Sequence, residues 1–146
     1  MKTISLLQPW ASLIAIGAKK IETRSWSTKY RGPLAIHASK GFPKLLRELC
    51  NTQPFKAILS KVGLNADNLP LGKIVATCDL VDCIRMTPEF IDLVESAKGS
   101  EIDFGTYKVG RYAWILENVK PLEKPMPTKG ALGLWEWEEQ NAKMRK

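Results

Sequence analysis

Apolar positions along this chain recur at two spacings, one typical of strands and the other typical of helices. Even-numbered residues are apolar through the longest strand-like segment, which is interrupted at Asp82. By contrast, the run from Trp10 to Ile16 is apolar nearly all round, which predicts a buried helix that ends at Gly17. The expected strands are residues 3–7, 20–26, 33–38, 73–86, 112–119 and 132–138. The expected helices are residues 10–16, 42–49, 55–62 and 89–97.

The order of these elements indicates the fold class. Strands and helices do not alternate regularly, as they would in a doubly wound fold. We therefore predict an α+β protein, a small mixed or antiparallel β-barrel of about six strands with flanking helices. A single domain over residues 1–138 is followed by a polar tail, residues 139–146. Residues 98–110 are expected to form a mobile loop, and residues 121–130 a proline-rich connection.

Composition is ordinary for a globular protein and excludes few functions. The chain has 146 residues, of which 45% are hydrophobic and 25% charged, and this length suits one domain. No apolar run approaches the ~20 residues of a membrane span. No small-residue cleavage site follows the apolar N-terminal stretch. We expect a cytoplasmic protein without membrane attachment, and the sequence does not predict an oligomeric state.

Residues that could bind a metal are scarce. Cys50, Cys78 and Cys83 match no zinc-binding spacing, and the last two fall in an apolar strand, where free cysteine packs as a small hydrophobe. His37 is the single histidine, and no cluster of Asp or Glu accompanies it. The sequence therefore predicts neither a metal site nor a cofactor.

Positive charge is concentrated at the N-terminal end of the chain. The net charge is +7. Residues 1–40 contain a single acid, Glu22, whereas bases and acids nearly balance over residues 41–146. A local excess of positive charge is typical of proteins that bind phosphate-bearing partners. The total net charge alone, however, is also ordinary for a small domain. The basic residues of this stretch are Lys2, Lys19, Lys20, Arg24, Lys29, Arg31 and Lys40.

The densest charge lies where the buried helix meets the next strand. Alternate residues of a strand share a face, so Lys20, Glu22 and Arg24 should point the same way. Glu22 could then hold both cations, and Arg24 offers a planar fork for a phosphate or a base edge. Lys19 lies at the corner, and the sequence leaves its direction open. The alternative interpretation is a solvated strand face with self-compensating charge.

Aromatic and basic side chains interleave directly after this strand. Trp26 and Tyr30 alternate with Lys29 and Arg31. Flat aromatic rings can stack on unpaired bases while neighbouring cations follow the phosphates. A tryptophan is also often a core residue, as we expect for Trp114.

Further polar residues gather at the ends of two predicted segments. His37 is either a hydrogen-bonded structural residue or a cleft residue, because Ser39 and Lys40 leave the strand end with it. Lys129 precedes Gly130 on a tight turn. The candidate ligand-binding residues are Lys19, Glu22, Arg24, Trp26, Tyr30, Ser39, Lys40 and Lys129.

Several of these residues belong to a known pattern. G-x-K-x-x-E-x-R occupies residues 17–24, and all four defining positions match. The pattern follows Gln8-Pro9-Trp10, and Lys129-Gly130 and Leu134-Trp135 complete the likeness near the C-terminus. In this order, the motifs resemble those of the ASCH domain, a branch of the PUA-like superfamily, from end to end of the chain.

The resemblance implies a small β-barrel with helices covering a cleft that the motif residues line. It also implies RNA, DNA or a modified nucleoside as the ligand. Related members include N4-acetylcytidine amidohydrolases, single-strand ribonucleases and binding domains of transcription coactivators. The amidohydrolases have a nucleophilic threonine where this chain has Glu22, and the adjacent Thr23 should face away. That departure argues against deacetylase activity in this chain.

Three function classes remain open at this point. We favour a module that binds single-stranded RNA or a nucleotide-like ligand. The alternative is a hydrolase acting on RNA or a modified nucleoside, with Lys19 as an oxyanion or leaving-group stabiliser and Glu22 as a general base or acid. Arg24 would anchor the substrate, and Tyr30, Ser39 or Lys129 could assist. A protein-interaction domain is the third class.

Overall fold

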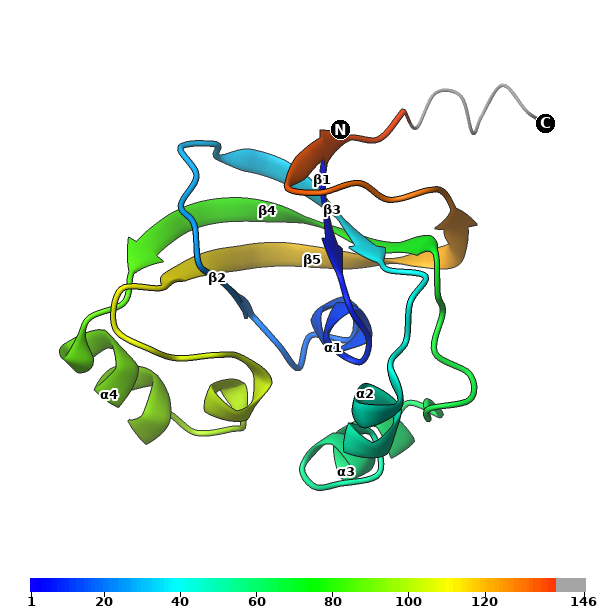
Figure 1. The fold of residues 1–146 in the computed structure, drawn as a ribbon, viewed down its shortest axis with the longest axis horizontal. Coiled ribbons are helices and arrows are strands. Elements are labelled where there is room, and N and C mark those ends of the chain that lie inside the picture. Colours follow the sequence, from blue (N-terminus) through cyan, green and yellow to red (C-terminus); the bar gives the residue numbers. More distant parts are fainter. Residues whose placement is uncertain (139–146) are drawn as a thin grey trace.

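The computed structural model describes residues 1–138, which form a curled sheet with helices gathered beneath it (Figure 1). The expected polar tail, residues 139–146, lies outside the described residues. The α+β class and the curled sheet with flanking helices are confirmed. The strands are β1 (Lys2–Leu6), β2 (Ile21–Arg24), β3 (Gly32–Ala38), β4 (Lys73–Arg85), β5 (Tyr112–Pro127) and β6 (Leu134–Glu136). The helices are α1 (Trp10–Ala15), α2 (Lys44–Leu49), α3 (Phe55–Ser60), α4 (Pro88–Ser96) and the short 3-10 helix η1 (Glu101–Phe104).

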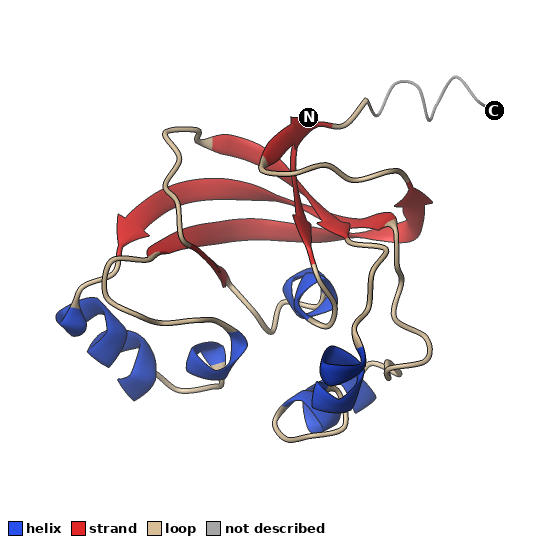
Figure 2. Ribbon diagram, viewed as in Figure 1, coloured by secondary structure: helices blue, strands red, loops and turns tan. Residues whose placement is uncertain are grey.

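All six described strands belong to one mixed sheet, in the order β2-β5-β4-β3-β1-β6. β1 and β3 run parallel, whereas the other neighbouring strands are antiparallel. The sheet curls into a half-barrel, and its two edge strands, β2 and β6, are not hydrogen-bonded to each other. The helices lie on one side of the sheet, which arches over α1 (Figure 2). Within residues 1–138, no helix is long and apolar enough to cross a membrane.

α1 is buried because it belongs to two hydrophobic cores. Its Ala11 and Ile14 pack among strand residues around the fully buried Trp114, which is a core residue as predicted. Its Leu13 packs in a second cluster with Phe55 of α3 and Phe104 of η1. A helix that is covered on opposite sides must be apolar nearly all round, which explains the pattern seen in the sequence.

β5 is longer than the sequence predicts. It runs to Pro127 instead of ending near residue 119, and it pairs with β4 through several register shifts. β2 covers the outer edge of β5 only from Tyr112 to Ile115. Beyond that point β5 is an edge strand, which tolerates the missing N–H of its prolines. The last strand is shorter than predicted, because β6 comprises only Leu134–Glu136.

Gly17 turns the chain from α1 toward β2. Its φ is +84°, a value that a residue with a side chain rarely adopts. The turn lets the backbone amides of Ala18 and Lys19 both donate to the carbonyl of Leu13, at 3.0 Å each. The helix therefore ends at a glycine, as predicted, and this ending fixes the direction in which Lys19 leaves the helix.

Replacing Gly17 by alanine should lower the free energy of unfolding by about 1 kcal/mol, because the new residue must hold a positive φ. No heavy atom lies within 4 Å of the added methyl position, so backbone strain alone would cause the loss. Gly41→Ala is the matched control, since its methyl also meets nothing within 4 Å and its φ is not positive. Urea unfolding of both variants measures the difference, and equal stability would contradict this account.

Candidate functional site

Lys19 is completely buried although its side chain is basic. Its exposed fraction is 0%. Its Nζ donates to the carbonyl oxygens of Ile21, at 2.6 Å, and Phe104, at 2.7 Å. The third neighbour is Glu22, whose Oε1 lies 3.6 Å away. An ammonium group has three donors, of which two are used by carbonyls, and its charge is paired with Glu22. Burial lowers the pKa of Lys19, while the negative charge of Glu22 opposes that shift.

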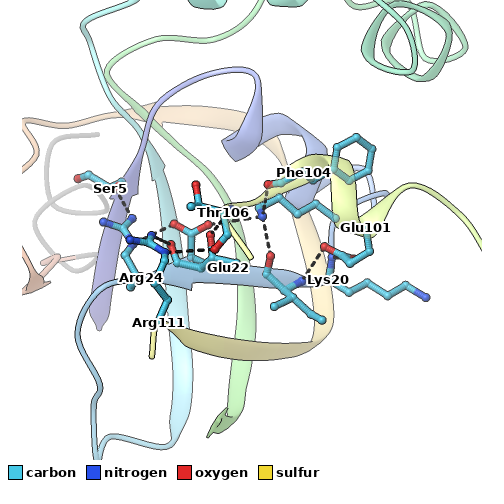
Figure 3. Close-up of polar contacts among 11 residues, drawn as sticks. Ser5, Lys20, Glu22, Arg24, Glu101, Phe104, Thr106 and Arg111 are labelled. Carbon is cyan, nitrogen blue, oxygen red and sulfur yellow. Dashed lines mark hydrogen bonds and ion pairs between the residues drawn. The ribbon is translucent and has the colours of Figure 1, made fainter. Parts of the chain in front are cut away.

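Glu22 joins Lys19 to Arg24. Its second carboxylate oxygen lies 2.9 Å from Arg24 Nε, so one acid holds two cations. Arg24 also extends from β2 and donates through Nη2 to the carbonyl of Ser5 in β1, at 2.8 Å (Figure 3). Because β2 and β1 are not neighbours in the sheet, this contact bridges the open side of the half-barrel.

The structure corrects the predicted partner of Glu22. The sequence predicts Lys20 on the same strand face as Glu22 and Arg24. Instead, Lys20 is exposed and forms no ion pair within residues 1–138. Strand alternation does not apply to it, because β2 begins only at Ile21. Lys19, whose direction the sequence left open, pairs with Glu22.

The segment predicted to be a mobile loop, residues 98–110, forms one wall of the site. It contains η1, and Glu101 at the start of η1 accepts hydrogen bonds from the backbone amides of Lys20, at 2.7 Å, and Ile21, at 3.3 Å. Burial raises the pKa of Glu101, while these hydrogen bonds oppose the shift. The segment is thereby attached to the start of β2.

A cavity of about 520 Å³, here named the tryptophan cleft, opens beside the Lys19–Glu22–Arg24 network. Trp10 and Trp26 are half-buried in its walls. Glu22 and Arg24 contribute polar atoms, and Arg111 adds a second guanidinium. Mostly apolar walls with a few fixed polar groups are typical of small-ligand sites. Other lining residues include Leu6, Leu49, Phe55, Phe104, Asp103 and Thr106.

A second cavity, of about 940 Å³, is here named the lysine cavity. Lys40, which follows β3, and Lys129, which follows β5, are exposed at this cavity. None of the described residues that line it is an Asp or a Glu. Ser5, Arg24 and Ser39 line both cavities, so the lysine cavity and the tryptophan cleft are adjacent.

Six of the eight predicted site residues line these cavities. Lys19 is enclosed behind Glu22 and lines neither cavity. Tyr30 also lines neither, because its hydroxyl donates to the carbonyl of Pro33 and its ring packs against the main core. The six lining residues are Glu22, Arg24 and Trp26 with Ser39, Lys40 and Lys129. Ligand binding by all eight stays a prediction.

Sequence reasoning missed Ser5, Trp10 and Arg111 as lining residues. Trp10 lies in the predicted buried helix, and no property of its neighbours indicates that one edge faces a cavity. Arg111 reaches the cleft because β2 pairs with the start of β5, which places Arg24 opposite Tyr112. That pairing joins segments far apart in sequence, so residue spacing carries no signal for it.

His37 is buried and hydrogen-bonded, and it also lines the lysine cavity. Its Nε2 donates to the carbonyl of Thr128 at 2.9 Å. Its Nδ1 is then free to accept the hydroxyl proton of Ser5, also at 2.9 Å. Trp135 Nε1 donates to the same hydroxyl at 3.1 Å. This chain of contacts ties β1, β3 and β6 to the turn after β5.

The N-terminal positive charge does not form one continuous patch. Lys2 pairs with Glu136 at 3.0 Å, and Arg31 pairs with Asp82 at 3.6 Å, outside both cavities. Within residues 1–138, no three His, Cys, Asp or Glu side chains gather in a way that could hold a metal ion. The basic residues of this stretch without an ion pair to the described residues are Lys20, Lys29 and Lys40.

Comparison with known proteins identifies the family. The profile of the ASCH domain matches residues 4–126. The chain belongs to the ASCH domain family. This ASCH domain is 28% identical over 137 residues to activating signal cointegrator 1 of Mus musculus, and the same holds for that of Homo sapiens. The match covers 90% of this chain and 21% of each relative, so the chain spans about a fifth of their length.

Solved ASCH structures have the same fold. The crystal structure of ASCH from Zymomonas mobilis has a TM-score of 0.56 and 15% sequence identity, and the match covers 97% of this chain and 90% of that chain. A single-residue variant of that protein gives a TM-score of 0.54 at 16% identity, covering 99% of this chain and 94% of the variant. At such identities, the likeness establishes the ASCH fold and not the ligand.

Replacing Lys19 by methionine should lower the free energy of unfolding by about 3 kcal/mol, because breaking a buried ion pair leaves its partners unsatisfied. Two backbone carbonyls lose their donor, and Glu22 loses one of its two cations. Lys20→Met is the matched control next in sequence, and as an exposed substitution it should change stability by no more than about 0.5 kcal/mol. Urea unfolding compares the two, and similar losses would show that Lys19 does not hold the network.

Acid should destabilise this ASCH domain through His37. Burial lowers the pKa of His37, while its hydrogen bond to Thr128 opposes the shift. The unfolded chain therefore takes up the proton first, near the ordinary pKa of about 6.5. The free energy of unfolding should fall as the pH drops below that value toward the lower pKa of the folded state.

The control for this pH dependence is His37→Asn, because His37 is the single histidine. In urea titrations, the variant should lose the slope between about pH 5 and 6.5 and keep only the acid dependence of the carboxyl groups. A lower overall stability of the variant does not affect the test, because the quantity compared is the slope of the unfolding free energy against pH and not its absolute value. Parallel profiles for the two proteins would rule out His37 as the source.

Proposed function

We propose that this ASCH domain binds single-stranded RNA, or a nucleotide-like ligand, in the tryptophan cleft. The observation that supports this proposal most strongly is that one cavity of about 520 Å³ combines two half-buried indoles with a fixed Glu22–Arg24 pair. Base–aromatic stacking is a common source of affinity for single strands. The volume lies within the range of about 300–1,000 Å³ that is usual for small-ligand sites.

Glu22 and Arg24 suit the edge of a nucleobase. Glu22 accepts hydrogen bonds and Arg24 donates them, so the pair matches a base that presents an amino group next to an acceptor. Contacts to Lys19 and to the carbonyl of Ser5 hold the two side chains before any ligand arrives. A preorganised site loses less conformational entropy on binding. In this proposal, Lys19 positions Glu22 and does not touch the ligand.

The neighbouring contacts favour binding over hydrolysis. The ammonium group of Lys19 is completely buried, donates to two carbonyls and lines neither cavity, so it is not placed to reach a leaving group. The hydroxyl of Thr23 accepts the backbone amide of Thr106 at 3.0 Å. Gly105 lies against the same side chain, since a Cβ there would approach Thr23 Cγ2 to 2.7 Å. The sequence predicts that Thr23 faces away, but it lines the tryptophan cleft. Its side chain is nevertheless buried and held by Thr106 and Gly105, which argues against a role as a mobile, exposed nucleophile.

Binding is tested by fluorescence anisotropy with a labelled single-stranded RNA of mixed sequence at several salt concentrations. Affinity should fall as salt rises, because phosphate contacts release counterions. Glu22→Gln should weaken binding about tenfold, which is roughly the 1.4 kcal/mol of a charge-assisted hydrogen bond. Glu95→Gln, an exposed change on α4, is the matched control and should bind like the wild type.

Two results would reject the proposal. One is the absence of RNA binding by the wild type at low salt, and the other is binding that salt does not weaken. Incubation with RNA and with N4-acetylcytidine completes the test. Turnover by the wild type that Glu22→Gln abolishes would replace the binding function with a hydrolase. Thermal unfolding of each variant checks that the fold is retained.

A further inference from the structure

Arg24 lies at the junction of the tryptophan cleft and the lysine cavity, and it lines both. Its Nε faces Glu22 at 2.9 Å, and its Nη2 donates to the carbonyl of Ser5 at 2.8 Å (Figure 3). Its Nη1 donates no hydrogen bond to any residue in the range 1–138. A guanidinium held in this way keeps free N–H groups between the two cavities, and a phosphate is the acceptor that best fits such a fork.

The two cavities differ in their chemistry. Glu22 and Asp103 offset the charges of Arg24 and Arg111 in the tryptophan cleft, so a phosphate finds no excess of cations there, whereas the indoles favour a base. The lysine cavity has the cations of Lys40 and Lys129 and, among the described residues, no acid. Leu132, of which 97% is exposed, adds an apolar surface at the lysine cavity. The lysine cavity therefore suits a nucleotide, since it offers cations to a phosphate and an apolar surface to a base.

The turn that carries Lys129 has a fixed position. The carbonyl of Thr128 accepts the Nε2 proton of the buried His37 at 2.9 Å. Gly130 lies directly against the same ring, since a Cβ on it would come within 2.6 Å of His37 Cε1 and 2.9 Å of Ser5 Oγ. Both neighbours of Lys129 are thus held, and its backbone is placed at the lysine cavity before any ligand binds.

We propose that this ASCH domain binds at least two consecutive nucleotides of a single strand. The base of one nucleotide lies in the tryptophan cleft, the phosphate that joins the two lies on Arg24, and the second nucleotide lies in the lysine cavity. The proposal rests on the function proposed above and narrows it, because a free nucleoside would occupy only one of two adjacent cavities. Lys40 and Lys129 are the cations of the second nucleotide.

A length series tests the proposal. Mixed-sequence RNAs of one, two and four nucleotides, each with a 5′-phosphate, compete against a labelled RNA hexamer. Affinity should rise at least tenfold from one nucleotide to two and change little from two to four. The double variant Lys40→Met/Lys129→Met should weaken the dinucleotide about tenfold and the mononucleotide much less, because one nucleotide can still bind in the tryptophan cleft. For the dinucleotide, the slope of the logarithm of the binding constant against the logarithm of the salt concentration should become shallower by about 0.7 for each lost phosphate contact.

The matched control is Lys120→Met/Lys124→Met, which removes two exposed lysines of β5 that line neither cavity. It should bind every length like the wild type. The proposal is overturned if one nucleotide binds as tightly as two, or if Lys40→Met/Lys129→Met weakens both lengths equally. If the wild type binds no RNA of any length, the proposed function fails, and this inference fails with it.

Discussion

The arrangement of the site depends on one buried ammonium group. Removing a lysine from water costs several kcal/mol unless other acceptors replace the lost solvent. Lys19 finds its acceptors in three places: a carbonyl in β2, a carbonyl in η1 and the carboxylate of Glu22. The turn at Gly17 supplies the direction from which the side chain enters. Because β2 supplies two of these oxygens and η1 supplies the third, while the lysine itself leaves the end of α1, the helix end, the edge strand and the η1 segment are fixed relative to one another.

The cleft exists because side chains, and not a hydrogen-bond ladder, join the two sides of the half-barrel. β6 pairs with β1 only from Lys2 to Ile4, so the next carbonyl, that of Ser5, is free to accept from Arg24. A backbone ladder at this place would bring the strands to about 4.8 Å and close the space. A guanidinium bridge holds them farther apart. Arg24 thus contributes to the fold and also exposes polar atoms to both cavities.

Local pattern predicts the elements of this protein well and their contacts poorly. α1, the long β4 and the buried Trp114 follow from periodicity, because burial on a regular element leaves a repeating signal. Lys19 and Glu101 could not be placed, since the contacts from Lys19 to Phe104 and from Glu101 to Lys20 each join residues more than 80 positions apart. The extension of β5 through its prolines depends on which edge stays uncovered, and that is a property of the sheet order. The candidate residues were recognised by motif, whereas their division between two cavities required the fold.

Glu22 gives this ASCH site its chemical character. In the amidohydrolases that the family resemblance includes, a threonine occupies the corresponding place and acts as the nucleophile. In this chain a threonine at residue 22 would leave Lys19 and Arg24, both held by backbone carbonyls, without a carboxylate between them. Glutamate restores that charge and keeps lone pairs directed toward the cleft, but it removes the hydroxyl that would attack a substrate. The same network that stabilises the buried ammonium therefore places a fixed acceptor beside a fixed donor, and this arrangement supports the proposal that the site recognises a base.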